Sequence, residues 1–307
     1  MHVEEISSLT SPPCSPDQAF EYCARLTNAH YENFPVASLF LPEERRQYIQ
    51  AIYAFSRVAD DYADESSRPQ HERLELLNDW EQRLRDCFEG KADHPIFIAL
   101  RETVVQLNIP IEPLLDLLSA FKQDVTVNRY RTFDDVMDYC RRSANPVGRL
   151  VLMIFGHRDE ELFLLSDAIC SALQLTNFWQ DVDIDRRKDR LYLPLDDMKN
   201  FGFALEDWLE GRYGRAFQEL MRFQVERTRG MFYRGAALPS RVEKELQVEL
   251  RLVWFGGMEI LAMLDRVRYD ILKKRPRLSL LRKSAILGRA LFIKDLSSYR
   301  KKIKVFE

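Results

Sequence analysis

Two short stretches of the sequence place acidic and amide side chains at the spacing of helical turns. The first acidic row consists of Asp60 and Asp64, and the second consists of Asn177, Asp181 and Asp185. If both stretches are helical, residues four apart lie on one face in successive turns. Like charges at that spacing destabilise a helix by roughly 0.2–0.5 kcal/mol per pair, so each row favours a bound cation. Ligand sets made only of oxygen select Mg²⁺ or Mn²⁺ rather than zinc.

The neighbouring side chains indicate what such a cation would bind. Magnesium normally completes its shell with water and substrate phosphate, so two rows facing each other across a cavity would hold a diphosphate. Arg57 and Arg190 are placed to neutralise the remaining phosphate charge. A solvated acidic face is the common alternative for one such pattern, but Gln174, one turn before Asn177, is more typical of a ligand set. The chemistry that fits is metal-assisted loss of diphosphate in an apolar cavity.

The first row needs a helix that begins near residues 41–44 (LPEE), where proline and two carboxylates favour a helix N-terminus. Apolar residues then recur at intervals of three and four, at Tyr48, Ile52, Phe55, Ala59 and Tyr62. This repeat predicts an amphipathic helix. Tyr53 and Arg57 follow the same rhythm on the face that carries the first row.

The second row lies near the C-terminal end of a long helix predicted over residues 160–185. Carboxylates at a helix C-terminus face the negative end of the helix dipole, which costs a few tenths of a kcal/mol each. The basic run at residues 186–190 is expected to compensate part of that charge.

The remaining helices are predicted over residues 17–27, 73–88, 96–107, 113–128, 204–210, 212–235, 240–274 and 279–304. Asp17 is the expected cap of the first. Another helix opens at residues 134–135, and Pro146 and Gly148 should break or kink it. The neighbouring Arg141 and Asn145 predict a polar cavity wall at that bend, with a simple packing bend as the alternative.

Composition predicts an all-α fold. The 307 residues are 46% hydrophobic and 30% charged, which is typical of a soluble globular protein. Only 11 glycines and few strand-like alternations favour helices. Residues 1–16, rich in serine and proline, predict a flexible tail, and no internal linker divides residues 17–307, so a single domain is expected there.

Cysteine usage and charge bear on location and partners. Five scattered cysteines without CxxC spacing suit a reducing cytoplasm. No apolar run approaches the roughly 18 residues that span a bilayer, and no signal peptide pattern is present. Residues 265–304 hold 14 Lys or Arg against 3 Asp. This basic segment fits a solvated face, or a peripheral contact with the inner face of the cell membrane, better than nucleic acid, because its charges are mixed with leucine and isoleucine.

The acidic stretches resemble the aspartate-rich motifs of the squalene/phytoene synthases, which are all-α class I isoprenoid enzymes. Residues 53–65 (YAFSRVADDYADE) resemble the first motif, and residues 174–185 (QLTNFWQDVDID), followed by 189–194 (DRLYLP), resemble the second. The resemblance extends from about His30 to Lys283. It implies a helical bundle around a central cavity, in which three Mg²⁺ hold the diphosphate of a prenyl substrate.

The resemblance also implies roles for individual residues. Metal ligands are expected at Asp60, Asp64, Asn177, Asp181 and Asp185. Diphosphate-binding side chains are expected at Arg57, Gln174, Arg190, Tyr192, His30 and Asn33. Catalytic roles are expected for Tyr53, Arg141 and Asn145.

Departures from the family pattern favour one branch. Squalene synthases usually carry an aromatic and small residues where residues 139–148 read YCRRSANPVG, and the family commonly has arginine where this chain has Gln180. With residues 30–38 (HYENFPVAS), these features resemble the hydroxysqualene synthases of bacterial hopanoid pathways. That branch implies presqualene diphosphate as substrate and capture of the cation by water, so no NADPH is expected. Polar side chains such as Asn145 would hold the water.

Two alternatives stay open. Head-to-head prenyl condensation to presqualene diphosphate, squalene or phytoene would use the same motifs. A non-catalytic family-like assembly protein would be expected to lose ligands, whereas both rows are whole here. Neighbouring pathway enzymes are further expected partners, in addition to the prenyl diphosphate and the membrane surface.

Overall fold

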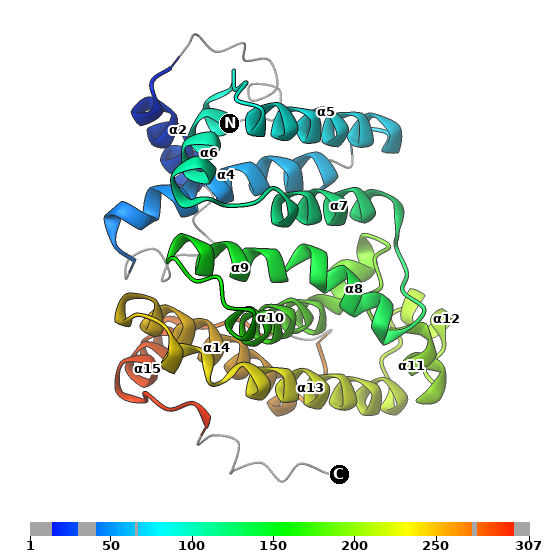
Figure 1. Ribbon diagram of the computed structural model, residues 1–307. Coiled ribbons are helices and arrows are strands. Elements are labelled where there is room, and N and C mark those ends of the chain that lie inside the picture. The colour runs from blue at the N-terminus through cyan, green and yellow to red at the C-terminus, as the bar shows by residue number, and fades with distance from the viewer. Residues whose placement is uncertain (1–13, 30–40, 65–66, 272–274, 298–307) are drawn as a thin grey trace. The chain divides into compact units, whose positions relative to one another are not determined.

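The computed structural model describes residues 14–29, 41–64, 67–271 and 275–297 (Figure 1). Within these ranges the regular elements are helices, and the only β-type pairing is an isolated parallel bridge between Arg129 and Leu191. The prediction of an all-α fold is confirmed. Of the expected tail, residues 1–13 lie outside the described residues.

The chain divides into two compact units. Unit 1 comprises residues 1–127 and 146–158, and unit 2 comprises residues 128–145 and 159–307. A single domain over residues 17–307 stays a prediction. The first acidic row belongs to unit 1 and the second to unit 2, so each is described within its own unit.

Unit 1 is built around one central helix, α4. Its helices are α2 (Pro16–Ala29), α4 (Glu43–Asp64), α5 (Gln70–Phe88), α6 (Pro95–Leu107), α7 (Glu112–Thr126) and all but the first residue of α9 (Asn145–Ile154). Helix α4 packs on α2, α5, α6 and α7. The rings of Trp80 and Phe97 lie 4.5 Å apart, and Trp80 Nε1 donates to the backbone oxygen of Phe55 at 3.2 Å. These contacts bury the apolar face of α4, as the three-and-four repeat predicted.

Unit 2 is built around the long helix α10. Its helices are α8 (Phe133–Ser143), α10 (Glu160–Arg187), α11 (Leu195–Asn200), α12 (Leu205–Leu209), α13 (Arg215–Gly235), η2 (Leu238–Arg241), α14 (Lys244–Arg266) and α15 (Leu280–Phe292). Helix α10 packs on α13, α14 and α8. A side chain at Gly235 would place its Cβ 2.7 Å from the backbone oxygen of Leu165, so glycine permits the close approach of α10 and α13. Trp179 is fully buried and its Nε1 donates to Thr228 Oγ1 at 2.7 Å.

The start of α2 corrects a predicted cap. Ser15 Oγ accepts from the backbone N–H of Gln18 at 3.3 Å, and the backbone N–H of Ser15 donates to Gln18 Oε1 at 3.0 Å. This reciprocal pair is a capping box, and it satisfies two backbone donors at once. Asp17 is therefore the wrong cap, and the predicted tail runs into the first helical residue, Pro16.

Other helix predictions also differ from the structure. Helix α14 ends at Arg266 rather than 274, because Arg268 and Tyr269 take positive φ values of 50° and 60°. The apolar residues beyond Arg266 extended the predicted pattern past this turn. Helix α11, which has Pro194 as its cap residue, was not predicted.

The bend between α8 and α9 is confirmed. Helix α8 ends at Ser143 and is followed by Ala144, with a φ of −116°, before α9 begins at Asn145. Pro146 lies in the first turn of α9, where its missing N–H breaks no helical hydrogen bond.

Candidate functional site

The first acidic row lies on the partly exposed face of α4. The Asp60 side chain is 45% exposed, and its Oδ2 lies 3.5 Å from Arg57 Nη1. Arg57 also donates to Asp61, one turn further along. Burial lowers the pKa of Arg57, but the nearby Asp61 and Asp60 carboxylates raise it overall. Asp64 is the last residue of the helix and is exposed. The row is therefore accessible to solvent, and its arginine, Arg57, is held by contacts within the same helix.

Tyr53 lies half-buried on the same face as this row. Burial raises the pKa of its phenol, Arg57 opposes that shift, and the Asp60 and Asp61 carboxylates add to it. The phenol therefore stays protonated near neutral pH. It is suited to donate a hydrogen bond to an anion rather than to act as a base.

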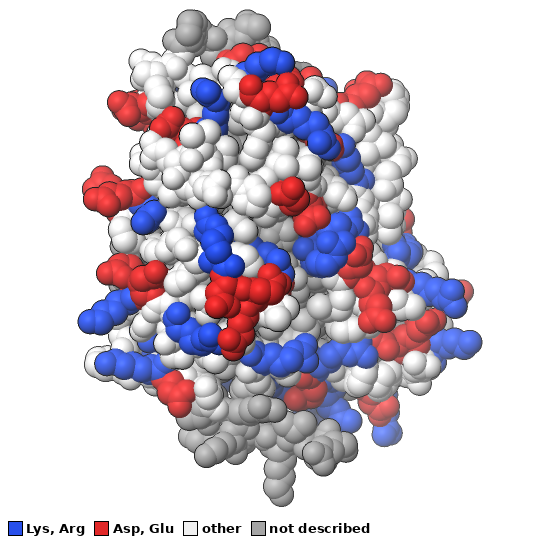
Figure 2. All heavy atoms as spheres, viewed as in Figure 1, with Lys and Arg blue, Asp and Glu red and all other residues white. Residues whose placement is uncertain are grey.

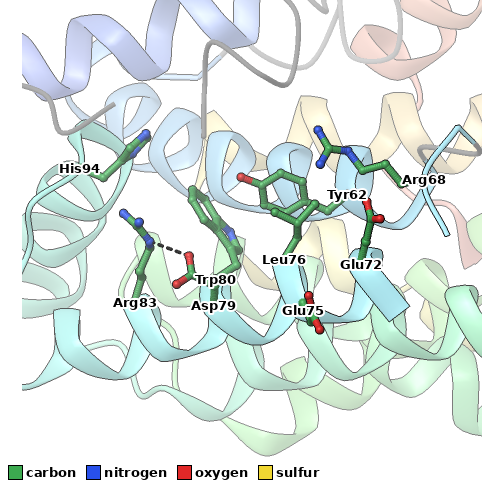
Figure 3. A pocket seen from close by; sticks show the side chains of 9 residues that line it. All are labelled: Tyr62, Arg68, Glu72, Glu75, Leu76, Asp79, Trp80, Arg83 and His94. Carbon is green, nitrogen blue, oxygen red and sulfur yellow. Dashed lines mark hydrogen bonds and ion pairs between the residues drawn. The ribbon is translucent and has the colours of Figure 1, made fainter. Parts of the chain in front are cut away.

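A separate pocket of unit 1 lies between α5, Tyr62, Arg68 and His94 (Figure 3). Its α5 side includes Asp79, which accepts from Arg83 at 2.9 Å. Tyr62 is two residues after Asp60 on α4, so it points to a different side of the helix. The pocket contains no residue of the predicted diphosphate site.

The second acidic row in unit 2 has a more elaborate environment. Asn177 is exposed, whereas Asp181 and Asp185 are half-buried. Asp181 accepts hydrogen bonds from two nitrogens of the Arg275 guanidinium, Nε and Nη2, and its Oδ2 lies 2.8 Å from Nη2. Asp183 lies off the row and pairs with Arg186 at 3.0 Å. The basic run that begins in the last turn of α10 therefore compensates Asp183, as predicted, while a distant arginine compensates Asp181.

Arg275 was missed by sequence reasoning. It lies 94 positions after Asp181, and no local spacing connects the two. Hydrogen bonding to Asp181 raises the pKa of Arg275, and burial opposes that effect, while the Asp185 carboxylate adds to it. Gln180 Nε2 donates to the backbone oxygen of Pro276, which ties the segment carrying Arg275 to α10. Gln180, noted above only as a departure from the family pattern, thus has a visible structural contact.

The segment after α10 folds back along the end of that helix. The backbone N–H of Arg190 donates to the backbone oxygen of Asp185 at 2.8 Å. The backbone N–H of Leu191 donates to the backbone oxygen of Asn128 at 2.9 Å. Arg129 holds the turn by donating to Asp189, which has a φ of 56°. Asp185, Arg190 and Tyr192 consequently line one small pocket of unit 2.

Aromatic rings cover this part of α10. Tyr192 stacks on Phe178 with ring centroids 3.6 Å apart and an interplanar angle of 5°. Tyr130 and Tyr139 lie 5.6 and 5.9 Å from Tyr192. The arrangement offers π faces and apolar edges next to the second row, which suits shielding of a carbocation from water.

The polar residues at the α8–α9 bend differ in placement. Asn145 is buried, and its Oδ1 accepts from Ser171 Oγ at 2.7 Å. Ser171 lies on α10, one turn before Gln174, which is half-buried. The Arg141 side chain is 56% exposed and pairs with Asp138 at 2.8 Å. Asn145 therefore contacts α10 through Ser171, whereas the Arg141 side chain is largely exposed.

Comparison with known proteins identifies the family. Residues 27–282 match the family model for squalene/phytoene synthase, which is most of the chain. The chain belongs to the squalene/phytoene synthase family. The predicted resemblance is confirmed, and family members are isoprenoid synthases that act on prenyl diphosphates.

Relatives with different activities are similarly close. A hydroxysqualene synthase of Zymomonas mobilis is 36% identical over 228 residues, covering 72% of this chain and 75% of the relative. A phytoene synthase of Arthrospira platensis is 32% identical over 280 residues, covering 86% of this chain and 89% of the relative. The crystal structure of squalene synthase HpnC from Alicyclobacillus acidocaldarius is 41% identical, with a TM-score of 0.80 over 84% of this chain and 97% of that one.

The donor sets of both rows fit the divalent metal on which the family generally depends. In the part of the chain that the structure describes, no three His, Cys, Asp or Glu side chains form a metal-binding group by themselves. Magnesium is typically bound through one or two carboxylates together with water and substrate phosphate. Partly exposed carboxylates such as Asp60 are therefore suitable ligands for it. His30 and Asn33, expected to contact the diphosphate, lie outside the described residues.

Proposed function

We propose that this squalene/phytoene synthase family member is a hydroxysqualene synthase. It would take presqualene diphosphate and release hydroxysqualene and diphosphate, which makes it a lyase acting on a carbon–oxygen bond. The observation that supports the proposal is the buried hydrogen bond between Ser171 and Asn145, because polar side chains would hold an ordered water at a position where squalene synthases are expected to carry an aromatic and small residues. The hydroxysqualene synthase relative from Zymomonas mobilis supports the same assignment.

The two acidic rows would bind Mg²⁺, expected to be three ions. Asp60 and Asp64 supply the carboxylates of one row, and Asn177, Asp181 and Asp185 supply the oxygens of the other. Bound Mg²⁺ would supply electrostatic stabilisation of the negative charge that develops on the leaving diphosphate. The remaining oxygens would accept hydrogen bonds from protein side chains.

Five described side chains, all half-buried, would bind the diphosphate itself, namely Arg57, Gln174, Arg190, Tyr192 and the protonated phenol of Tyr53. Arg275 joins them as a sixth. Without substrate its guanidinium neutralises Asp181, and a phosphate group offers the same bidentate geometry as that carboxylate. Binding of diphosphate would let Arg275 exchange its partner and free the Asp181 oxygens for metal.

The fate of the cation would be decided by the chain's own residues. The C–O bond breaks with its electron pair going to diphosphate, and the cyclopropylcarbinyl cation rearranges beside the aromatic rings of Phe178 and Tyr192. A water molecule then forms the new C–O bond and loses one proton. We propose that Asn145 orients this water. Arg141 also stays a prediction for that role, although its guanidinium lies in an exposed ion pair.

Product analysis tests the proposed reaction. The enzyme is incubated with Mg²⁺ and presqualene diphosphate, without NADPH, and the lipids are extracted and identified. Hydroxysqualene should be the main product. If presqualene diphosphate is left intact while farnesyl or geranylgeranyl diphosphate is condensed, the proposal is wrong and a condensing activity replaces it. The Arthrospira platensis phytoene synthase relative, which matches more of the chain, is the reason for including geranylgeranyl diphosphate.

Variants at the bend test the water-positioning role. Asn145→Leu and Ser171→Ala should lower the share of hydroxysqualene among the products and increase hydrocarbon products, while diphosphate release continues. Arg141→Gln is measured in parallel, and a change confined to that variant would move the role from Asn145 to Arg141. An unchanged hydroxysqualene share in Asn145→Leu would exclude Asn145.

A further inference from the structure

Helix α15 exposes large apolar side chains on one side. Leu280, Leu281 and Phe292 are 81%, 84% and 86% exposed, and Leu291 is also exposed. The opposite side contains the buried Ile286 and Ala290, and α15 packs on α14 in unit 2. Both the inner and the outer face of α15 are therefore apolar, whereas an ordinary surface helix has a polar outer face.

The outer face of α15 carries no charge. Residues are about 100° apart around a helix, which places Ser284, Gly288 and Leu291 in line with Leu280 and places Ala285 and Phe292 in line with Leu281. Basic residues occupy the margins of this strip, with Lys283 on one side and Arg282 and Arg289 on the other. On the visible surface of the protein, by contrast, acidic and basic side chains are interleaved (Figure 2).

The arginines at one margin are held in place by a buried carboxylate. Glu259 of α14 is buried and lies 2.9 Å from Arg266 and 3.6 Å from Arg289, and it also accepts from Arg282. These residues line a groove of about 370 Å³ that also includes Leu281. Three guanidinium groups around one carboxylate leave an excess of positive charge there. The groove is thus basic, ordered and adjacent to the apolar strip.

We propose that α15 binds in the plane of an anionic lipid bilayer. Its four exposed apolar side chains insert among the acyl chains, and Arg282, Arg289 and Lys283 bind lipid phosphates at the margins. Burial of large apolar side chains and attraction of basic residues to an anionic surface both favour binding. These terms together favour interfacial binding.

The basic residues of α15 favour an anionic bilayer over a second copy of the chain as the partner of this face. Helix α15 contains three basic residues, Arg282, Lys283 and Arg289, at the margins of the apolar strip and no Asp or Glu. Pairing this face with a second copy of itself would bring like charges together, whereas an anionic bilayer neutralises them. None of the described helices is long and apolar enough to cross a membrane, so the contact is with one leaflet.

Vesicle binding tests the proposal. The full-length protein is mixed with phosphatidylcholine vesicles, with or without phosphatidylglycerol, and the bound fraction is measured by sedimentation. Binding should require phosphatidylglycerol and weaken as salt is added. Leu281→Gln combined with Phe292→Gln should reduce partitioning at least about tenfold, since roughly 1.4 kcal/mol corresponds to one decade. Lys283→Gln should weaken binding less. The matched control is Leu164→Gln on α10, because Leu164 is 60% exposed and lies outside α15.

Three results would overturn the proposal. They are absence of binding by the unaltered protein, equal binding by the double variant and the control, and conversion of a dimer to a monomer by the double variant. The last would show that a second copy covers the strip. Because the assay contains no substrate, its outcome is independent of the proposed reaction. Turnover of detergent-dispersed presqualene diphosphate should be unchanged in the double variant, which separates failure of membrane binding from failure of catalysis.

Discussion

The two acidic rows differ in what surrounds them. In α4, Asp60 and its neighbour Asp61 hold Arg57 within one turn of the same helix. In α10, Asp181 is paired with Arg275, which comes from a segment 94 positions away. A folded-back strip of chain and stacked aromatic rings further enclose the second row. Both rows are products of helix periodicity, but the partners of the first row are local, whereas those of the second row are brought by tertiary contacts.

Mutations in the two rows should therefore have different effects on activity and on stability. A change in the exposed first row should act on chemistry and leave the packing of unit 1 intact. A change in the second row also removes the partner of a half-buried arginine, which adds a structural cost. Activity and stability measured together can therefore distinguish the rows.

The largest expected effect is loss of turnover when either row is interrupted. Asp60→Ala and Asp181→Ala should each lower kcat for presqualene diphosphate at least about 10³-fold, because each removes a proposed ligand of the Mg²⁺ that would stabilise the leaving group. Thermal unfolding should show a loss of stability only for Asp181→Ala, which leaves Arg275 unpaired. Asp183→Ala is the control for activity, since Asp183 lies off the row; its stability is not compared, because it also leaves Arg186 without its carboxylate partner. Activity within tenfold of the unaltered enzyme in Asp60→Ala would remove the first row from the site.

The next largest effect is a change in how stability depends on pH, caused by a buried glutamate in α14. Glu249 lies in α14, which packs on α10, and burial raises its pKa from 4.5 to about 7. The unfolded chain releases this proton at lower pH than the folded chain, so stability falls as pH rises from about 4.5 to about 7. Glutamine has no proton to lose. Glu249→Gln should therefore raise the free energy of unfolding by roughly 2–3 kcal/mol at alkaline pH.

Urea unfolding at pH 4.5 and pH 8 measures this effect. At the lower pH the variant and the unaltered protein should have similar stability, because the carboxyl group is protonated in the folded state and still about half protonated in the unfolded state. Glu245→Gln, at an exposed position on the same helix, is the matched control and should change little at either pH. A Glu249→Gln variant that is equally destabilised at both pH values would show that Glu249 is not a buried, uncharged acid.

The smallest expected effect comes from removing Arg275, the distant partner of the second acidic row. Arg275→Gln should raise KM for presqualene diphosphate about tenfold, a loss of roughly 1.4 kcal/mol in binding, with a smaller change in kcat. Arg275→Lys should recover only part of the loss, because an ammonium group cannot bind in the bidentate manner of a guanidinium. Gln180→Ala should act in the same direction, since Gln180 ties Pro276 to α10. Arg277→Gln, exposed two residues further on, is the control, and an equal effect there would indicate only a general loss of charge.

Much of the fold could be predicted because helices are local structures. The repeat of apolar residues located α4 and α10 nearly to their ends, and Pro146 marked the α8–α9 bend. The errors arose where a single hydrogen bond or turn decides the boundary. Ser15 rather than Asp17 caps α2, and the left-handed residues Arg268 and Tyr269 end the pattern that continues beyond α14.

The acidic rows themselves followed from the sequence alone, because a spacing of four fixes which side chains share a helical face. Family membership likewise followed from these motifs. The tertiary structure decided which distant groups meet them, namely Arg275 at Asp181, Ser171 at Asn145 and Tyr192 on Phe178. It also decided that the leucines of α15 face outward. Periodicity is a property of one helix, whereas these contacts depend on how separate segments pack, and no local pattern encodes that.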